Sequence, residues 1–357
     1  MSIDTSANRR PAPFPLVDVL TWRFSLRGSA PNWRDDDLHA SGLSMIHLTA
    51  GASQVLDFAP FCDGIIETLE VIEQNPDRLF LVKSADDFDK LGKDGRIGVM
   101  LGLQNSGSIG TVARRVEMLW QLGIRVMQLT YNDSNLLGDG CLEERNGGLS
   151  QFGRDVVAEC NRSGVLLDVS HAAPGTAADV LARSRQPVVA SHSSRRVWAS
   201  NPRNIPDEVL LAVARSGGVV GVPAWGPLLW DGKSHTRPSI RTFTDAVVGM
   251  IDLLGEDAVA VGTDLPLFAT GTLAEERAVV GRMVQSHPGA FAQYVAAFGD
   301  DLRSQYCADF DNIGLWHTVP AALAEAGLSQ EVIAKVVGGN WMRVCRTVWA
   351  TRERILP

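Results

Sequence analysis

One recurring pattern restricts the fold of this chain more than any other feature. Eight short apolar runs of strand length recur along it, and polar loops and longer stretches with helical periodicity separate them. Alternating strands and helices favour a parallel sheet, and eight such units in one chain favour a closed (β/α)8 TIM-type barrel over an open sheet. The expected strands are Leu16–Leu20, Ser44–Thr49, Ile97–Leu103, Val126–Leu129, Val165–Val169, Pro187–Ala190, Val219–Pro223 and Ala258–Gly262.

The rest of the chain is predicted around this barrel. Residues 1–14, rich in Pro, Arg and Ser, are expected to form a flexible arm, and residues 15–357 a single barrel domain. A long insertion from about Leu265 to Asp311 follows the last strand. The expected helices are Gly64–Gln74, Val112–Leu122, Leu149–Ser163, Ala173–Ser184, Asp207–Ala214, Thr244–Leu254, then Ala274–Gln285 and Gly289–Phe298 in the insertion, and the closing helices Pro320–Ala326 and Gln330–Arg346.

Composition excludes several classes of partner and compartment. The formal charge is −8 and no basic stripe stands out, which disfavours a nucleic-acid partner. Five scattered cysteines without CxxC spacing indicate a reducing compartment. The most apolar stretch, Gly217–Trp230, spans 14 residues and contains two prolines, whereas a spanning helix needs about 20. With no secretion signal in view, we expect a cytoplasmic protein that acts on a small molecule away from membranes.

Polar residues follow several of the expected strands directly. They are Gln104, Tyr131, His171, His192 and Asp264. In a (β/α)8 barrel the active site lies at the carboxyl ends of the strands, so these side chains are candidates for catalysis. His47 lies inside the second strand, and whether it faces the barrel mouth is left open. The other histidines, His39, His235, His287 and His317, are interpreted as ordinary structural or surface residues.

Several segments resemble the membrane (renal) dipeptidase family, a metallopeptidase branch of the amidohydrolase superfamily. They are GLSQFGRDVVAECNRSGVLLDVSH, PVVASHSSRRVWASNPRNIPDEVL, GGVVGV, VGTD and GGNWMRV. The resemblance runs from about Pro15 to Arg346. It implies a (β/α)8 barrel, often a homodimer, and hydrolysis of a dipeptide by two zinc ions that share a bridging carboxylate and a water.

Part of the family's site matches this chain. The resemblance implies that His171 and His192 are metal ligands, that Asp264 takes the proton, and that Arg203 in NPRNIP binds the substrate carboxylate. We expect Asp264 to act as a general acid or base whatever else the site contains.

The remaining family positions differ. Where the family reads Asp-Gly-His-Asn-Asp, this chain reads Asp18-Val19-Leu20-Thr21-Trp22, so Leu20 and Trp22 replace two ligands. Gln104 replaces the bridging Glu, and Tyr131 replaces the His that binds the oxyanion. Two divalent cations ~3.5 Å apart repel by roughly 19 kcal/mol at an effective dielectric constant of about 20, and the carboxylates that offset this repulsion are missing. A two-zinc centre is not expected.

A site with one metal ion, or with none, remains an alternative. His171 and His192 could hold one Zn²⁺ with Gln104 as a weak third ligand, or the site could work without metal. Tyr131 could donate to an oxyanion, and it and Gln104 join Asp264 as catalytic candidates. Arg203, Tyr131 and Trp22 are the substrate-binding candidates. Three further tryptophans, Trp198, Trp225 and Trp230, are considered as parts of an aromatic mouth.

Three functions follow from this mixture. The first is a dipeptidase-like hydrolase of a dipeptide or small amide with a one-metal or metal-free site. The second is a barrel repurposed for metal-independent chemistry, such as a lyase, isomerase or condensation step, on a small carboxylate-bearing and aromatic molecule. The third is a non-catalytic binding paralogue.

Overall fold

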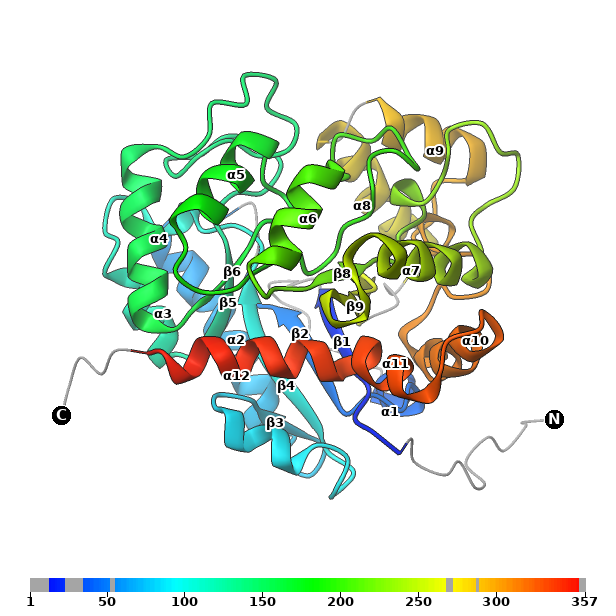
Figure 1. Ribbon diagram of the computed structural model, residues 1–357, viewed down its shortest axis with the longest axis horizontal. Helices are drawn as coiled ribbons and strands as arrows, with labels where there is room; N and C mark the ends of the chain where they lie inside the picture. Colours follow the sequence, from blue (N-terminus) through cyan, green and yellow to red (C-terminus); the bar gives the residue numbers. More distant parts are fainter. Residues whose placement is uncertain (1–12, 23–34, 52–54, 268–271, 287–288, 353–357) are drawn as a thin grey trace.

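A computed structural model describes residues 13–22, 35–51, 55–267, 272–286 and 289–352, in which helices surround a core of parallel strands (Figure 1). All eight expected strands are present, with ends that differ by a few residues. Two strands were not expected: β3 is only three residues long, and β10 contains a proline. The strands are β1 Val17–Trp22, β2 Met45–Thr49, β3 Leu79–Leu81, β4 Ile97–Leu103, β5 Ile124–Gln128, β6 Leu166–Asp168, β7 Val188–Val189, β8 Val220–Val222, β9 Val259–Val261 and β10 Leu265–Pro266.

The strands follow one another around a barrel in chain order. The main sheet has the order β10-β1-β2-β4-β5-β6-β7, all pairs parallel, and β3 pairs with β4 outside this path. Strands β8 and β9 form a second parallel pair. Backbone hydrogen bonds join this pair to the main sheet, from Ala190 N to Val219 O (3.0 Å) on one side and from Asp264 N to Leu20 O (3.0 Å) on the other. The α/β barrel expected from the sequence is confirmed.

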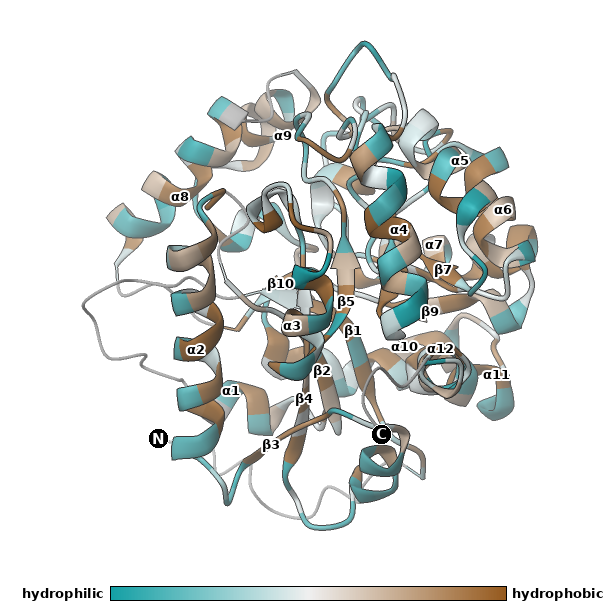
Figure 2. Ribbon diagram, turned by 90° about the vertical axis from the view of Figure 1, so that its left-hand side faces the viewer, coloured by the Kyte–Doolittle hydropathy of each residue, from teal (hydrophilic) through white to brown (hydrophobic). Residues whose placement is uncertain are grey.

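The helices cover the outside of the barrel with their apolar faces turned inward (Figure 2). Several begin earlier than expected. Helix α2, for example, starts six residues before Gly64 because Pro60 lies in its first turn, where a missing N–H costs no hydrogen bond. The helices are α1 Asp35–Ala40, α2 Phe58–Gln74, α3 Arg115–Gln121, α4 Gln151–Ser163, α5 Pro174–Arg183, α6 Asp207–Arg215, α7 Ile240–Leu254, α8 Leu273–Ser286, α9 Ala290–Phe298, α10 Val319–Glu325, α11 Gln330–Ala334 and α12 Asn340–Ala350.

Helix α12 closes the amino-terminal end of the barrel, which leaves the carboxyl end for a site. Its residues Trp341, Val344 and Cys345 pack in one cluster with the first residues of β1 and β2. A π-helical turn at Lys335–Gly339 precedes α12 and interrupts the expected closing helix. A Cβ on Gly338 would lie 2.8 Å from Pro15 O, so the chain can approach β1 this closely only with glycine there.

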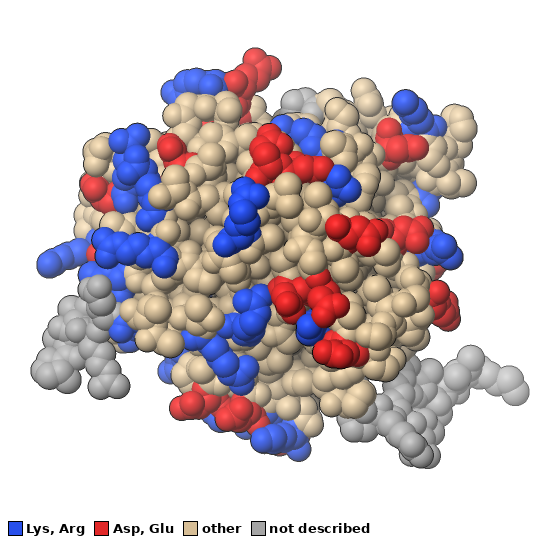
Figure 3. Space-filling model, viewed as in Figure 1, with Lys and Arg blue, Asp and Glu red and all other residues tan. Residues whose placement is uncertain are grey.

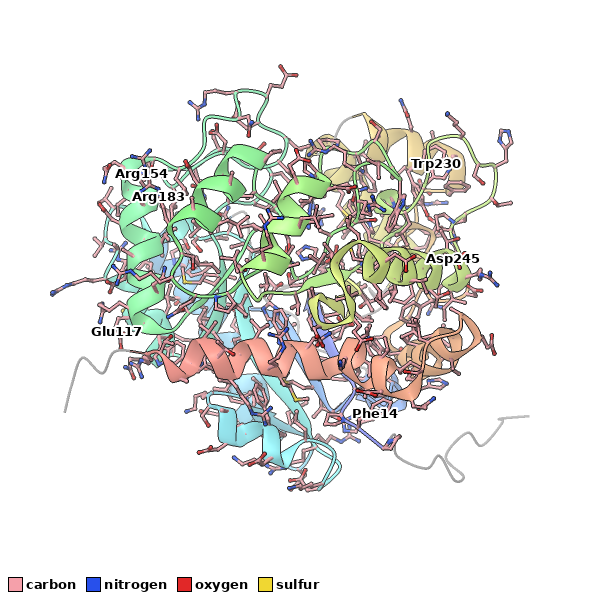
Figure 4. The ribbon with its side chains drawn as sticks, in the orientation of Figure 1. Phe14, Glu117, Arg154, Arg183, Trp230 and Asp245 are labelled. Carbon is pink, nitrogen blue, oxygen red and sulfur yellow. The ribbon has the colours of Figure 1, made fainter. Side chains whose placement is uncertain are left out.

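The insertion after the last barrel strand is attached through aromatic side chains. Trp230 contacts the rings of Tyr294 and Phe298 at 5.8 and 5.4 Å, and Trp225 contacts Phe291 at 5.2 Å. Figure 4 labels Trp230 beside the ribbon of this insertion, at the edge of the molecule far from α12. No helix in the described ranges is both long and apolar enough to cross a membrane.

Candidate active site

The residues predicted for the site, from strand ends and from the family resemblance, lie together at the carboxyl end of the barrel. Four of them are buried, with 1–6% of their surface exposed: Gln104, His171, His192 and Arg203. Three others keep more exposure: Trp22, Tyr131 and Asp264. The buried group therefore forms a floor, and the second group offers side chains that a small molecule can reach.

His171 and His192 face each other across the floor, with their Nε2 atoms 3.1 Å apart. The amide oxygen of Asn132 accepts a hydrogen bond from His171 Nδ1 at 2.7 Å. Ser191 Oγ donates to the Asp168 carboxylate and therefore accepts from His192 Nδ1, at 2.8 Å. Both Nδ1 atoms thus carry a proton, and two Nε2 lone pairs converge on one point.

Two such lone pairs can share either one proton or one cation. Burial, aided by the charges of Arg203 and His47, holds the pKa of His192 well below its usual value, which disfavours the proton. Two nitrogen ligands on one tetrahedral zinc lie ~3.4 Å apart when each Zn–N bond is about 2.0–2.1 Å, close to the observed separation. The pair therefore has the geometry for a single metal ion.

Other side chains stand where the resemblance implies the remaining metal ligands. Leu20 is fully buried and offers no donor atom, and Trp22 uses its indole N–H within the protein. In the part of the chain that the structure describes, no group of three or more His, Cys, Asp or Glu side chains is placed to hold a metal ion. The residues present do not fit a two-zinc centre, and a single ion would have only the two histidines and neutral oxygens.

Asp264 occupies a backbone conformation that is rare for its residue type, with φ = 59°. Its carbonyl oxygen accepts hydrogen bonds from Trp22 Nε1 and Tyr306 Oη, each 2.8 Å long. Desolvation raises the pKa of the Asp264 carboxyl to about 7; the charge of Arg203 opposes this shift and the carboxylate of Asp18 adds to it. A carboxyl with a pKa near neutral can take and return a proton at physiological pH.

Tyr131 lies beside this carboxyl and over the histidine pair. Its ring stacks on the His171 imidazole at 4.1 Å with 23° between the planes. Burial raises the pKa of the Tyr131 hydroxyl above its usual value, and the nearby charge of Asp264 has the same effect. The phenol therefore keeps its proton and can donate a hydrogen bond to a developing negative charge.

Arg203 is buried beneath the site and supports the histidine segments. Its guanidinium donates to Ser170 O, to Ser193 Oγ at 3.1 Å and to His192 O at 2.8 Å. These bonds use three of the five N–H groups of an arginine, and two remain. Burial lowers the pKa of Arg203, and the nearby charges of Asp264 and Tyr131 oppose that shift, so the three side chains lie close together. The contact of Arg203 with a substrate carboxylate stays a prediction.

Three of the tryptophans considered for the mouth lie elsewhere. Trp225 and Trp230 pack against the insertion, as described above. Trp198 lines a cavity of about 520 Å³ against the outer side of α7, where Asp245 also lies (Figure 4). Only Trp22 is at the site. Trp225 and Trp230 therefore fit loop packing, which was the alternative weighed for each single tryptophan, and Trp22 is the one for which position in the sequence indicated the site.

His47 lies inside the barrel rather than in its mouth. Its Nδ1 donates to Val19 O at 2.7 Å and its ring stacks on Trp341 of α12 at 5.6 Å. A Cβ at Gly102 would lie 2.0 Å from His47 Nε2, so glycine is required on the neighbouring strand. His47 therefore fills the barrel interior below the histidine pair.

Sequence reasoning missed the residues that orient the site. Asp168 and Ser191 belong to the same runs as the two histidines, LLDVSH and VVASHSS, and their position at strand ends was a usable signal. Asn132, next to Tyr131, carried a similar signal. Tyr306 had none, because it comes from the insertion, 42 residues after Asp264.

Comparisons with known proteins support the same picture. A family model described as membrane dipeptidase, peptidase family M19, matches residues 45–272. An amidohydrolase from Pseudomonas aeruginosa of known structure is 30% identical with a TM-score of 0.77, over 94% of this chain and 97% of that one. Dipeptidase verJ of Clonostachys rogersoniana is 33% identical over 202 residues, 56% of this chain, and dipeptidase tcpJ of Claviceps purpurea is 25% identical over 292 residues, 80% of this chain. The matches cover 50% and 60% of these two fungal relatives.

Proposed function

The chain belongs to the membrane dipeptidase family, peptidase family M19, and from that premise we propose that it hydrolyses a dipeptide or small amide with a site that lacks the two-zinc centre. The carrying observation is that Asp264, Tyr131 and the buried Arg203 lie close enough for their charges to act on one another, while Leu20 and Trp22 stand where the resemblance implies ligands of a second metal. The hydrolase class follows from the family; the reduced site and the substrate are our proposal.

The chemistry assigned to these residues is balanced for amide hydrolysis. Asp264 takes a proton from a water molecule as its oxygen attacks the carbonyl carbon. Tyr131 donates a hydrogen bond to the oxygen that becomes negative. As the C–N bond breaks, Asp264 returns the proton to the leaving amine. The two remaining N–H groups of Arg203 bind the carboxylate of the substrate and orient it.

A single zinc ion is compatible with this proposal. His171 and His192 would hold it through Nε2, with the amide oxygen of Gln104 as a weak further ligand. Such an ion would polarise the substrate carbonyl and lower the pKa of a bound water. Every residue role above is independent of that ion.

A second function is favoured by how Trp22 is used. Its indole does more than fill the place of a lost ligand, because it bonds the backbone of Asp264. A rebuilt contact of this kind suits a site adapted to metal-independent chemistry, such as a lyase or isomerase step, on a carboxylate-bearing molecule.

Homodimerisation, a small-molecule substrate and a cytoplasmic location stay predictions. On the face shown in Figure 3, acidic and basic side chains are interspersed over much of the surface.

The first test measures bound metal and activity together. Elemental mass spectrometry of protein purified without chelators should give at most one equivalent of zinc, and a panel of dipeptides should be cleaved with or without a chelator. Two equivalents would contradict the reduced site. Zero or one equivalent, with no cleavage of any dipeptide or small amide, would favour the second function. A ligand-induced shift in melting temperature without turnover of any tested compound would indicate the binding paralogue.

A further inference from the structure

The least favourable backbone conformation near the site is held by two aromatic side chains. Asp264 is one of two non-glycine residues with positive φ in the described ranges, the other being Asn146. A non-glycine residue in this region is conformationally unfavourable and persists where its surroundings fix it. Something must therefore hold Asp264 in place.

The surroundings of the Asp264 peptide identify the holding groups. Trp22 Nε1 and Tyr306 Oη each donate to Asp264 O at 2.8 Å, and Trp22 Nε1 also lies 3.3 Å from Tyr306 Oη. On the other side of the residue, Asp264 N donates to Leu20 O at 3.0 Å. The peptide groups on both sides of the Asp264 Cα atom are thus hydrogen-bonded. These bonds restrict the positions that the Asp264 side chain can take.

Each holding group is itself anchored. Trp22 belongs to β1, which pairs with β10, and its carbonyl accepts from Leu267 N at 3.0 Å. Tyr306 is 1% exposed and follows the short 3₁₀ helix Arg303–Gln305 of the insertion. An antiparallel bridge joins it to Trp225, next to strand β8. The insertion therefore reaches the site through Tyr306.

From this geometry we propose that Trp22 and Tyr306 are positioning residues that hold Asp264 in its left-handed conformation and so keep its carboxyl near Tyr131 and Arg203. The inference rests on the proposed role of Asp264 as the acid or base. Trp22 would then perform a structural task at the position where the family has a metal ligand, and the insertion would be a component of the site.

The test follows the titration of Asp264, which needs no substrate. Aspartate labelled with ¹³C at Cγ is observed by NMR between pH 3 and 9, and the Asp264 signal is assigned by its absence in Asp264→Asn. Besides the holding groups, the charged groups facing this carboxyl are Arg203, Asp18 and Tyr131. In the unchanged protein the midpoint should lie near 7. In Tyr306→Phe the Asp264 carbonyl loses one of its two donors, and the proposal expects the residue to leave its left-handed conformation and the carboxyl to leave its desolvated position. The midpoint should then fall by about one unit or more toward the usual ~3.9.

Tyr294→Phe is the matched control. Tyr294 is a buried tyrosine of the same insertion whose hydroxyl donates to a backbone carbonyl, Ser304 O, at 3.2 Å. Its loss should lower stability similarly and leave the Asp264 midpoint unchanged. A Tyr306→Phe midpoint equal to that of the control, or an unchanged protein that titrates near 4, overturns the proposal.

Trp22→Phe supplies a second variant that removes the other donor, so either variant decides if one fails to fold. A shift of the midpoint in a protein that cleaves no tested compound would support the positioning role while leaving the proposed hydrolysis without support. The two ideas can thus fail separately.

Discussion

The two sides of the site contrast sharply. On the side of β6 and β7, the Nε2 atoms of His171 and His192 face each other. Asn132 and Ser191 orient the two rings through their Nδ1 atoms. On the side of β1 and β4, Leu20, Trp22 and Gln104 stand where the family resemblance places charged ligands. One side is preserved for a cation or proton, and the other has been rebuilt with apolar and neutral groups.

Under the proposed function, one half of a metal site has changed while the histidines of the other half keep their arrangement. The preserved histidines are tied to the barrel by Arg203, which bonds the backbone of both histidine segments, so their geometry does not depend on the opposite side. The rebuilt side has acquired its own connection, from Trp22 to Asp264. We therefore expect Asp264, at the junction of the two sides, to matter most.

Asp264→Asn tests that junction and should have the largest effect on activity. Loss of an acid–base group typically costs 10²–10⁴-fold, so we expect kcat to fall roughly a thousandfold on whichever dipeptide or amide is cleaved. Asparagine tolerates positive φ, so the melting temperature measured near pH 7 or above should stay nearly unchanged. Turnover retained at the original rate would remove Asp264 from the mechanism and leave the preserved histidines as the active side.

Restoring the rebuilt side asks whether the barrel still has room for two ions. The triple change Leu20→His, Trp22→Asp and Gln104→Glu returns the family's donors, so bound zinc should rise from at most one to close to two equivalents by elemental mass spectrometry. Adding His192→Ala to the triple variant is the control and should reduce the gain. If the triple variant folds and binds no additional zinc, the mapping of these positions onto the ligands is wrong.

The two sides also differ in how well the sequence predicts them. The preserved side lies directly after predicted strands, so strand periodicity alone placed His171 and His192 together. Trp22 could be located, but its hydrogen bond could not, because it depends on the backbone conformation of Asp264. Tyr306 was beyond reach, since a residue in an insertion without strand periodicity carries no sign of the strand end that it contacts.

Tyr131→Phe tests whether the residue that replaces a family histidine, beside the preserved pair, contributes a donor to catalysis. The phenol proton should stabilise the oxyanion, so its loss should lower kcat by about a hundredfold and leave KM within a factor of a few. Phenylalanine keeps the stacking on His171, which isolates the hydroxyl. If kcat/KM falls by the same factor because KM rises while kcat stays unchanged, Tyr131 would instead be assigned to substrate binding.

The smallest expected effect is a pH dependence of stability that belongs to Asp264. Its pKa is raised to about 7 in the folded chain against ~3.9 unfolded, so the folded state binds the proton more tightly, and this favours folding at low pH. That contribution is fully present below pH ~4 and is lost as the pH rises through about 7. Asp264→Asn lacks this contribution at every pH. The free energy of unfolding of the variant minus that of the unchanged protein, both measured with urea, should therefore rise by about 2 kcal/mol from pH 5 to pH 8. Burial also raises the pKa of Asp18 to about 7 and lowers the pKa values of His47 and His192. These groups are present in both proteins and largely cancel in this difference. A difference that does not change with pH would mean that the Asp264 carboxyl titrates as it does in water, and the rebuilt side would then have no acid or base tuned to neutral pH.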